Sequence, residues 1–189
     1  MKGPEWTDVL LEAFPLCCAA MGMIHCEYAR LEAADLARAV AEPAWAERRL
    51  DALATEWTEL DLPPDEARYL SIGTAWGALY GLLRASADLP VDVIRGGGAL
   101  ELPVEPRFGP ARYLEPVEVR RAADALRATP FDQIAGHYDI AIVCDDDVCP
   151  EPAEHADDEP ARLRAPYEEL TVFFAASADV GDGVVVLLA

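Results

Sequence analysis

The sequence predicts an α+β fold, a small β-sheet covered by several helices, for a single domain over residues 21–189. Most of the chain has apolar residues that recur every three or four positions, as amphipathic helices do. Two short segments instead have the pattern of strands, over about residues 23–28 and about residues 184–188. A chain with few strands and many helices buries its apolar surface by packing helices onto the sheet.

The first part of the domain is expected to form one strand and two helices. Apolar and polar residues alternate roughly from Met23 to Tyr28, as in a half-buried strand. Helices are expected next, over about residues 32–41 and 44–60. The second has the clearest periodicity in the chain, which predicts one buried face. The apolar residues of that face are Ala46, Leu50, Leu53, Trp57 and Leu60.

A third helix is expected over about residues 72–84, and it contains three regularly spaced glycines. Gly73, Gly77 and Gly81 are four positions apart, so they would stack on one side of a helix. Each glycine costs a helix about 1 kcal/mol relative to alanine, so the stack needs a reason. Close packing against a neighbouring backbone is one reason, and a floor for a ligand is the alternative.

Turn residues divide the middle of the chain. Gly96–Gly98 predict a flexible turn, which lacks the lysine and the spacing of a phosphate-binding loop. Gly109–Pro110 mark another turn, which leads to a helix that begins at Pro116 and reaches about Arg127. Thr129–Asp132 resemble a helix start, with a hydroxyl cap, a proline at the first position and an acidic residue three positions after the cap.

The C-terminal part is expected to contribute a helix and the second strand. The helix is predicted over about residues 160–178, and Gly181–Gly183 turn the chain. The run Val184–Leu188 is almost wholly apolar and rich in β-branched residues, which favours a strand buried on both faces. The strand at Met23–Tyr28 is its expected partner.

A proline-broken acidic loop is predicted over about residues 144–160. Cys144, Cys149 and His155 suggest a metal site, but their spacing fits neither structural zinc patterns nor a calcium-binding loop. The sequence therefore predicts an acidic loop rather than a built metal site, and it leaves weak binding of Ca²⁺ or Zn²⁺ by the loop open. The acidic residues of the loop are Asp145, Asp146, Asp147, Glu151, Glu154, Asp157, Asp158 and Glu159.

The net charge restricts the partners that the protein can have. Fifteen basic and thirty-five acidic residues give a formal charge of −20. Such a surface repels nucleic acids and anionic membranes, so neither is expected as a partner, whereas a basic protein would be attracted. The five cysteines have no disulfide-framework spacing, which favours a reducing compartment, and we expect a cytoplasmic protein.

Residues 1–20 are expected to lie outside the domain, as a short helix or as an extension that precedes a start at Met21. Glu5 and Glu12 occupy positions that are basic and apolar in an export signal. No apolar stretch has the length needed to cross a bilayer.

No nucleophile motif, catalytic histidine arrangement or cofactor motif is recognisable, so no catalytic residue or cofactor is predicted. Trp76, Arg112, Tyr113 and Asp139 are the candidate residues of a ligand-binding pocket. Arg112 and Tyr113 are expected on an ordered turn-to-helix entry amid a large excess of acidic residues. The alternative is that Arg112 pairs with a buried acid such as Asp139 and the aromatic side chains belong to the core.

Several stretches are similar to the YfbM-like family, a bacterial domain family of unknown function. They are Met21–Ile24, Thr74–Trp76, Gly109–Leu114, Val148–Glu151 and the closing helix, turn and strand. The resemblance covers the chain from Met21 to its end and implies a compact α+β domain of bacterial origin. It implies no known activity.

The family resemblance also has departures that bear on function. Members of the family often carry polar groups where this chain has Gly73, Thr74, Gly77 and Tyr80, which argues against an enzyme. The leading hypothesis is a non-enzymatic binding or interaction protein, and an immunity-type role against a basic toxin would fit the charge. The alternative is a small-molecule-binding domain or enzyme that uses the pocket near Trp76 and Arg112.

Overall fold

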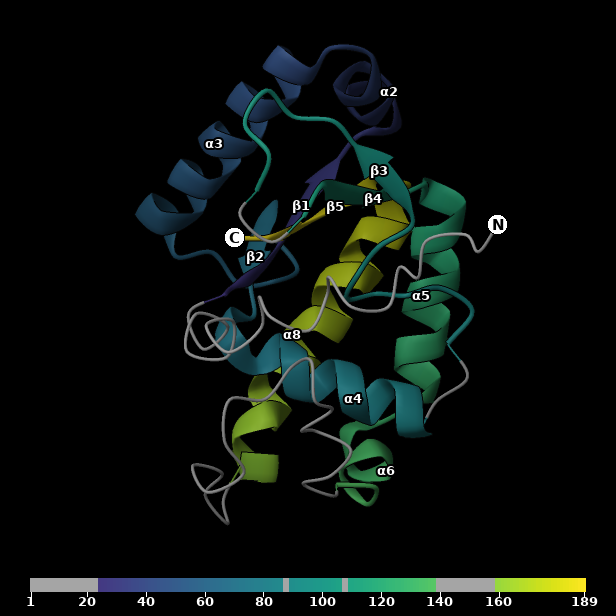
Figure 1. Cartoon of the computed structure of the whole chain (residues 1–189). Helices are drawn as coiled ribbons and strands as arrows, with labels where there is room; N and C mark the ends of the chain where they lie inside the picture. The colour runs from purple at the N-terminus through teal and green to yellow at the C-terminus, as the bar shows by residue number, and fades with distance from the viewer. Residues whose placement is uncertain (1–23, 87–88, 107–108, 139–158) are drawn as a thin grey trace, which may run out of the picture.

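A five-stranded antiparallel sheet forms the centre of the domain (Figure 1). The computed structural model describes residues 24–86, 89–106, 109–138 and 159–189. The strand order is β2-β1-β5-β4-β3, so the two ends of the domain meet in the middle of the sheet. The strands are β1 (Cys26–Leu31), β2 (Tyr69–Ser71), β3 (Gly98–Leu100), β4 (Ala111–Leu114) and β5 (Gly183–Leu188).

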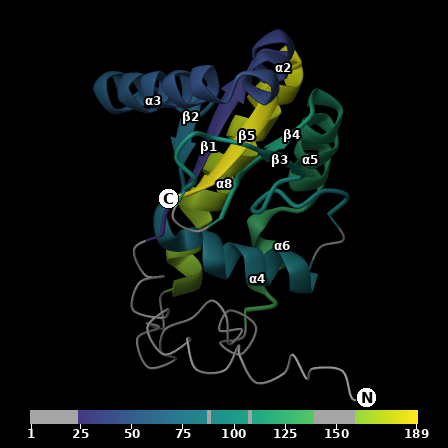
Figure 2. The ribbon, with the colours of Figure 1, turned by 45° about the horizontal axis from the view of Figure 1, so that its top comes forward.

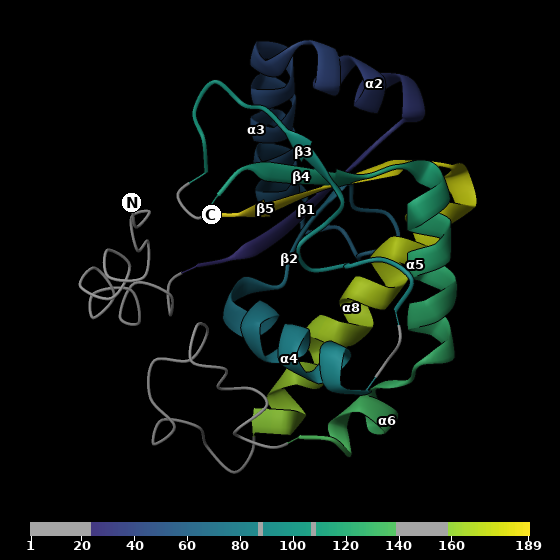
Figure 3. The same cartoon turned by 45° about the vertical axis from the view of Figure 1, so that its right-hand side comes forward.

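Helices cover both faces of the sheet, which confirms the predicted α+β class. Helices α2 and α3 lie on one face, and α4, α5, α6 and α8 lie on the other (Figures 2 and 3). A short 3₁₀ turn, η1 (Gly73–Ala75), precedes α4. The helices are α2 (Ala33–Ala41), α3 (Pro43–Leu60), α4 (Trp76–Ser86), α5 (Pro116–Ala128), α6 (Phe131–Ala135) and α8 (Glu159–Val180).

Strand β5 is the central strand, and its apolar residues explain its position. It pairs antiparallel with β1 on one side and with β4 on the other, which confirms the predicted pairing of the two terminal strands. Val184 and Val186 are buried in the core beneath α8, and Val185 is buried in the core beneath α2 and α3. Each fully buried valine stabilises the fold by about 1.5–3 kcal/mol, so a polar residue in this strand would be costly on either face.

The core on the α8 side is the larger and contains a cluster of aromatic rings. The Tyr28 ring lies 5.9 Å from the ring of Phe174 and 6.3 Å from that of Phe173. Both phenylalanines come from α8 and are fully buried. Edge-on and tilted contacts of this kind add about 0.5–1.5 kcal/mol beyond area burial, so they fix α8 against β1.

The predicted helix over residues 72–84 begins later than expected. Gly73 has a φ of +57°, a left-handed conformation that cannot continue into an α-helix, and α4 starts at Trp76. Gly73 is therefore not stacked above Gly77 and Gly81. The prediction of one helix with three aligned glycines is wrong, because spacing alone does not reveal a left-handed residue.

Two other predicted boundaries differ from the observed ones. The first strand runs to Leu31 rather than Tyr28, because its backbone pairs with β5 as far as Gly183. Helix α6 has Pro130 as its N-cap residue, so the predicted hydroxyl cap at Thr129 is wrong. The Thr129 carbonyl instead accepts a hydrogen bond from the Tyr167 hydroxyl of α8, which holds the chain before α6.

The predicted flexible turn at Gly96–Gly98 is in fact packed against β4. Gly98 begins β3 directly opposite Tyr113, and the tyrosine ring covers it. A Cβ on Gly98 would lie 2.5 Å from the ring carbon Cζ of Tyr113. A side chain at this position would therefore displace the ring, and glycine is required by packing rather than by flexibility.

This packing predicts how a substitution at Gly98 depends on Tyr113. Gly98→Ala should lower the free energy of unfolding by about 1–3 kcal/mol, because the ring must move away. In a Tyr113→Ala background the same substitution should be neutral, or stabilising by about 0.5–1 kcal/mol, because alanine is favoured over glycine in a strand. Urea unfolding of the four variants measures both effects. An equal cost in the two backgrounds would rule out the ring as the cause.

Candidate functional site

The predicted pocket residues Trp76 and Tyr113 lie on opposite faces of the sheet. Trp76 is only 6% exposed, and its indole nitrogen donates a hydrogen bond of 2.9 Å to the carbonyl of Ile24. It belongs to the core on the α8 side. Tyr113 packs against the core beneath α2 and α3. The fold therefore does not bring these two aromatic side chains together.

Arg112 stands in strand β4, not at the predicted turn-to-helix entry. Side chains alternate along a strand, so Arg112 lies on the face opposite to Tyr113, where Gly96 approaches its Cβ. It is half-buried, and no ion pair links it to another residue in the described part of the chain. Asp139, its predicted neighbour, lies outside the described residues. Neither Trp76, Arg112 nor Tyr113 is among the described lining residues of the cavities near Arg68 and near Tyr80.

The other regions singled out in the sequence lie outside the described residues. Metal sites and membrane-spanning helices can be examined only within the described ranges. Residues 1–20 and the acidic loop up to residue 158 are not described, and neither are Cys144, Cys149 and His155. Within the described ranges, no group of three or more His, Cys, Asp or Glu side chains is arranged to hold a metal ion. No helix in those ranges combines the length and apolar character needed to span a membrane.

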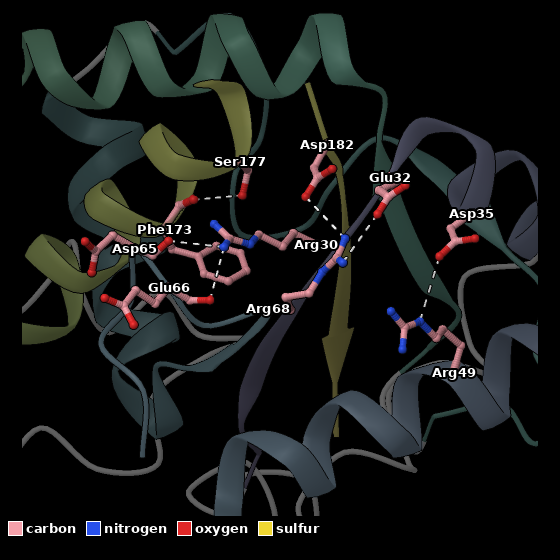
Figure 4. Close-up of polar contacts among 10 residues, drawn as sticks. All are labelled: Arg30, Glu32, Asp35, Arg49, Asp65, Glu66, Arg68, Phe173, Ser177 and Asp182. Atoms are coloured by element: carbon pink, nitrogen blue, oxygen red, sulfur yellow. Dashed lines mark hydrogen bonds and ion pairs between the residues drawn. The ribbon is translucent and has the colours of Figure 1, made fainter. Parts of the chain in front are cut away.

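The most unusual polar arrangement is a pair of arginines, Arg30 in β1 and Arg68 directly before β2 (Figure 4). The backbone N–H of Arg30 donates to the carbonyl of Arg68 over 3.0 Å, which continues the β1–β2 register and places the two residues opposite each other. Side chains directly opposite in an antiparallel pair have Cβ atoms about 4.5–5.5 Å apart, and like charges there are destabilising. The arrangement therefore needs nearby negative charge.

Arg30 is held by backbone carbonyls and an aromatic ring. Its Nη2 donates to the carbonyls of Asp65 and Glu66 over 3.1 and 3.2 Å. Its guanidinium carbon lies 5.9 Å from the ring centre of Phe173. Burial lowers the pKa of Arg30, and the charge of Arg68 acts in the same direction, while Asp182 opposes both. The carbonyls thus position this guanidinium without neutralising it.

Arg68 is near two carboxylates but forms no direct hydrogen bond with either. Its Nη1 lies 3.6 Å from Oε1 of Glu32, and its Nη2 lies 3.6 Å from Oδ2 of Asp182. Both distances exceed those of a hydrogen bond. The Asp182 side chain is only 5% exposed, and burial raises its pKa even though Arg68 and Arg30 lower it. The ion pairs are therefore loose.

Hydrogen-bonding capacity is left unused around this pair of arginines. The Nε groups of Arg30 and Arg68 are buried, and neither has a partner among the residues that the structure describes. An unsatisfied buried donor costs about 1–3 kcal/mol. Helix α2 begins beside them with Glu32 as N-cap, and no side chain caps its first turn. Its free N–H groups add positive potential at that end.

These groups line a cavity of about 640 Å³, which we call the Arg30–Arg68 cavity. It lies between the start of α2, strands β1 and β2, and the turn from α8 to β5. Asp182 is held there because its backbone N–H donates to the Ser177 carbonyl over 2.9 Å. The lining residues are Arg30, Glu32, Ala33, Ala34, Glu66, Arg68, Val180, Gly181 and Asp182.

Sequence reasoning missed this cavity for two physical reasons. The expected first strand ended at Tyr28, so Arg30 was not placed on the apolar face that Cys26 and Tyr28 share. Strand β2 has only three residues, too few for an alternating pattern, so the position of Arg68 was not predicted. A charged residue two positions after Tyr28 in an extended strand was the available signal.

A five-stranded sheet between two helical layers, with a charged cavity at one edge, defines this chain as an α+β domain with a candidate ligand site. Residues 21–187 match a family described as a domain of unknown function (DUF1877), and the chain belongs to that family. This confirms the predicted family resemblance. No curated protein matches the chain.

A solved structure has the same fold. The crystal structure of YfbM from Escherichia coli, a protein of unknown function, matches with a TM-score of 0.56 and 13% sequence identity. The match covers 88% of this chain and 100% of the YfbM chain. At this identity the similarity concerns the fold alone. Neither the family nor the fold therefore assigns a specific function to this chain.

The raised pKa of Asp182 predicts how stability depends on pH. Because the folded pKa lies above the ordinary value of 3.8, the carboxyl stabilises the fold below that pH, and this stabilisation is lost as pH rises through the folded pKa. We therefore compare the free energy of unfolding of wild type with that of Asp182→Asn. The difference, wild type minus variant, should be larger at about pH 4 than at about pH 7.

Urea unfolding at the two pH values measures this difference. Asp179→Asn, at an exposed position on α8 three residues before Asp182, is the matched control for the loss of one negative charge. A wild-type advantage that is larger at neutral pH would show that the arginines outweigh burial, and would contradict the prediction.

Proposed function

We propose that this domain is a non-enzymatic binding protein whose Arg30–Arg68 cavity holds a small zwitterion, a molecule with one carboxylate and one ammonium group. The observation that carries the proposal is the pair of incompletely satisfied arginines facing carboxylates across one cavity. A ligand carboxylate would receive the charge-assisted hydrogen bonds that Glu32 and Asp182 do not make with Arg68.

The charges of the cavity favour a zwitterion over a simple anion. The charged residues among the described lining are two arginines and three acidic residues, Glu32, Glu66 and Asp182, so their formal charge is −1 within a chain of charge −20. A simple anion would be repelled by the acidic surface, and a simple cation would face two guanidinium groups. A molecule with both charges can pair its carboxylate with the arginines and its ammonium group with the acids.

Size and chemistry also support binding. A volume of about 640 Å³ falls within the range of about 300–1,000 Å³ that is typical of small-molecule sites. Among the described residues that line the cavity, no Ser, Thr, Cys, Lys or His could act as a nucleophile. This composition suits recognition better than covalent chemistry.

Amino-acid titrations test the proposal directly. Each common amino acid, with acetate and methylammonium as singly charged controls, is titrated into the protein by calorimetry or NMR. At least one amino acid should bind saturably and more tightly than either control. Arg68→Gln should weaken the affinity for that amino acid by roughly 10-fold to 100-fold, because a hydrogen bond to a charged group contributes about 1.5–3 kcal/mol.

Arg120→Gln is the matched control, because Arg120 is an exposed arginine on α5 outside the cavity. It should leave the affinity unchanged. The proposal fails if no amino acid saturates the protein, if acetate binds as well as the best amino acid, or if the two variants behave alike.

A second candidate function is association with a basic protein through the acidic end of α3. Residues 50–67 contain six acidic residues and no basic one. No basic residue stands in the last turn of α3, where cations favour the helix dipole, so this end of the helix is strongly negative. The six residues are Asp51, Glu56, Glu59, Asp61, Asp65 and Glu66.

Charge neutralisation tests this second candidate. The triple variant Asp51→Asn, Glu56→Gln, Glu59→Gln should lose a stoichiometric protein partner that wild type retains from a lysate of the source organism. The control neutralises Asp124, Glu168 and Glu169, which are exposed on α5 and α8, and should retain the partner. Loss from both variants, or no stoichiometric partner even at low salt, would contradict it.

A further inference from the structure

A second cavity lies between α4 and residues 89–94, and five of the described residues that line it are apolar. Its volume is about 250 Å³. A cavity of about 150 Å³ holds benzene, so this one has room for a ring with a substituent or a short aliphatic chain. The apolar residues that line it are Leu83, Leu89, Val91, Val93 and Ile94.

Two arginines flank the aromatic ring at the edge of this cavity. The guanidinium carbon of Arg95 lies 4.3 Å from the ring centre of Tyr80, and that of Arg84 lies 5.4 Å from it. Both arginines are exposed, and neither forms an ion pair with a residue in the described part of the chain. The Tyr80 ring therefore has two guanidinium groups against it, neither of which is paired with a carboxylate of the described residues.

Asp92 is the one acidic residue among the described residues that line this cavity, and it has another role. Oδ1 of Asp92 accepts hydrogen bonds from the backbone N–H groups of Ile94 and Arg95 over 3.0 and 2.8 Å. These bonds shape the wall of the cavity and place Arg95 beside Tyr80. Asp92 thus organises the segment, and its carboxylate is already engaged.

We propose that this cavity binds a small hydrophobic carboxylate, with the apolar part inside and the carboxylate between Arg84 and Arg95. Each buried CH₂ group of such a ligand contributes about 0.8 kcal/mol. The guanidinium groups offer planar, bidentate geometry for the carboxylate. Among the described residues, this site shares no lining residue with the Arg30–Arg68 cavity, so the proposal is independent of the function proposed above.

A charged and a neutral probe of nearly the same shape separate this proposal from simple apolar binding. Benzoate, hexanoate and benzamide are titrated into the full chain, and the backbone amide NMR signals are followed. Benzoate or hexanoate should shift the signals of residues 80–84 and 89–95 saturably. Benzamide should bind at least about tenfold more weakly, because it lacks the charge that the two arginines recognise.

Substitutions of arginines test where benzoate binds. The double variant Arg84→Gln, Arg95→Gln should lower the affinity for benzoate at least about tenfold and leave the affinity for benzamide unchanged. The control is Arg120→Gln with Arg121→Gln, which removes two exposed arginines of α5 and should leave both affinities unchanged. Far-UV circular dichroism checks that both variants are folded.

The proposal is overturned if neither carboxylate saturates the signals, if benzamide binds as tightly as benzoate, or if the Arg84 and Arg95 variant keeps wild-type affinity. Shifts confined to signals outside α4 and residues 89–95 would also overturn it, because the ligand would then bind elsewhere.

Discussion

Backbone pairing of β1 with β2 is the constraint on which the candidate site depends. It places Arg30 directly opposite Arg68, and the pairing of β1 with β5 brings the turn that carries Asp182 to the same place. The ladder of backbone hydrogen bonds fixes the two backbones opposite each other, so both positively charged side chains start from the same face of the sheet. Two carboxylates lie 3.6 Å from the Arg68 guanidinium and compensate its charge only loosely. A fold selected for stability alone would favour apolar residues at such positions, which is why we interpret the cluster as a binding site.

The rest of the fold supplies the rigidity that this site needs. Strand β5 is buried on both faces and joins β1 to β4, so the sheet cannot shift without exposing its valines. Helix α8 packs its phenylalanines on β1, and one of them, Phe173, also lies beneath the guanidinium of Arg30. Phe173 therefore contributes both to the hydrophobic core and to the candidate site. A cavity built on rigid elements loses little conformational entropy when a ligand binds, so even weak charged contacts contribute to the affinity.

Much of the fold could be predicted because it follows from patterns longer than about ten residues or from strongly apolar runs. Helices α3 and α8 and the pairing of the terminal strands were predicted for these reasons, whereas α5 was predicted from the turn at Gly109–Pro110 and the proline at its first position. Strands β2, β3 and β4 have three or four residues, and their pairing depends on distant partners that no local pattern reveals. The candidate site was missed for the same reason, because Arg68 precedes β2. Gly98 was assigned to a turn because the ring that covers it belongs to Tyr113, fifteen positions later.

The central claim is that Arg68 and Asp182 are present for binding rather than for stability. The most direct measurement is the free energy of unfolding, in urea, of the double variant Arg68→Met, Asp182→Asn compared with wild type. Replacing both partners removes the repulsion between the arginines and the buried carboxylate together. We predict a stability equal to that of wild type within about 1 kcal/mol, or greater. A loss of more than about 3 kcal/mol would show a structural ion pair and would contradict the account.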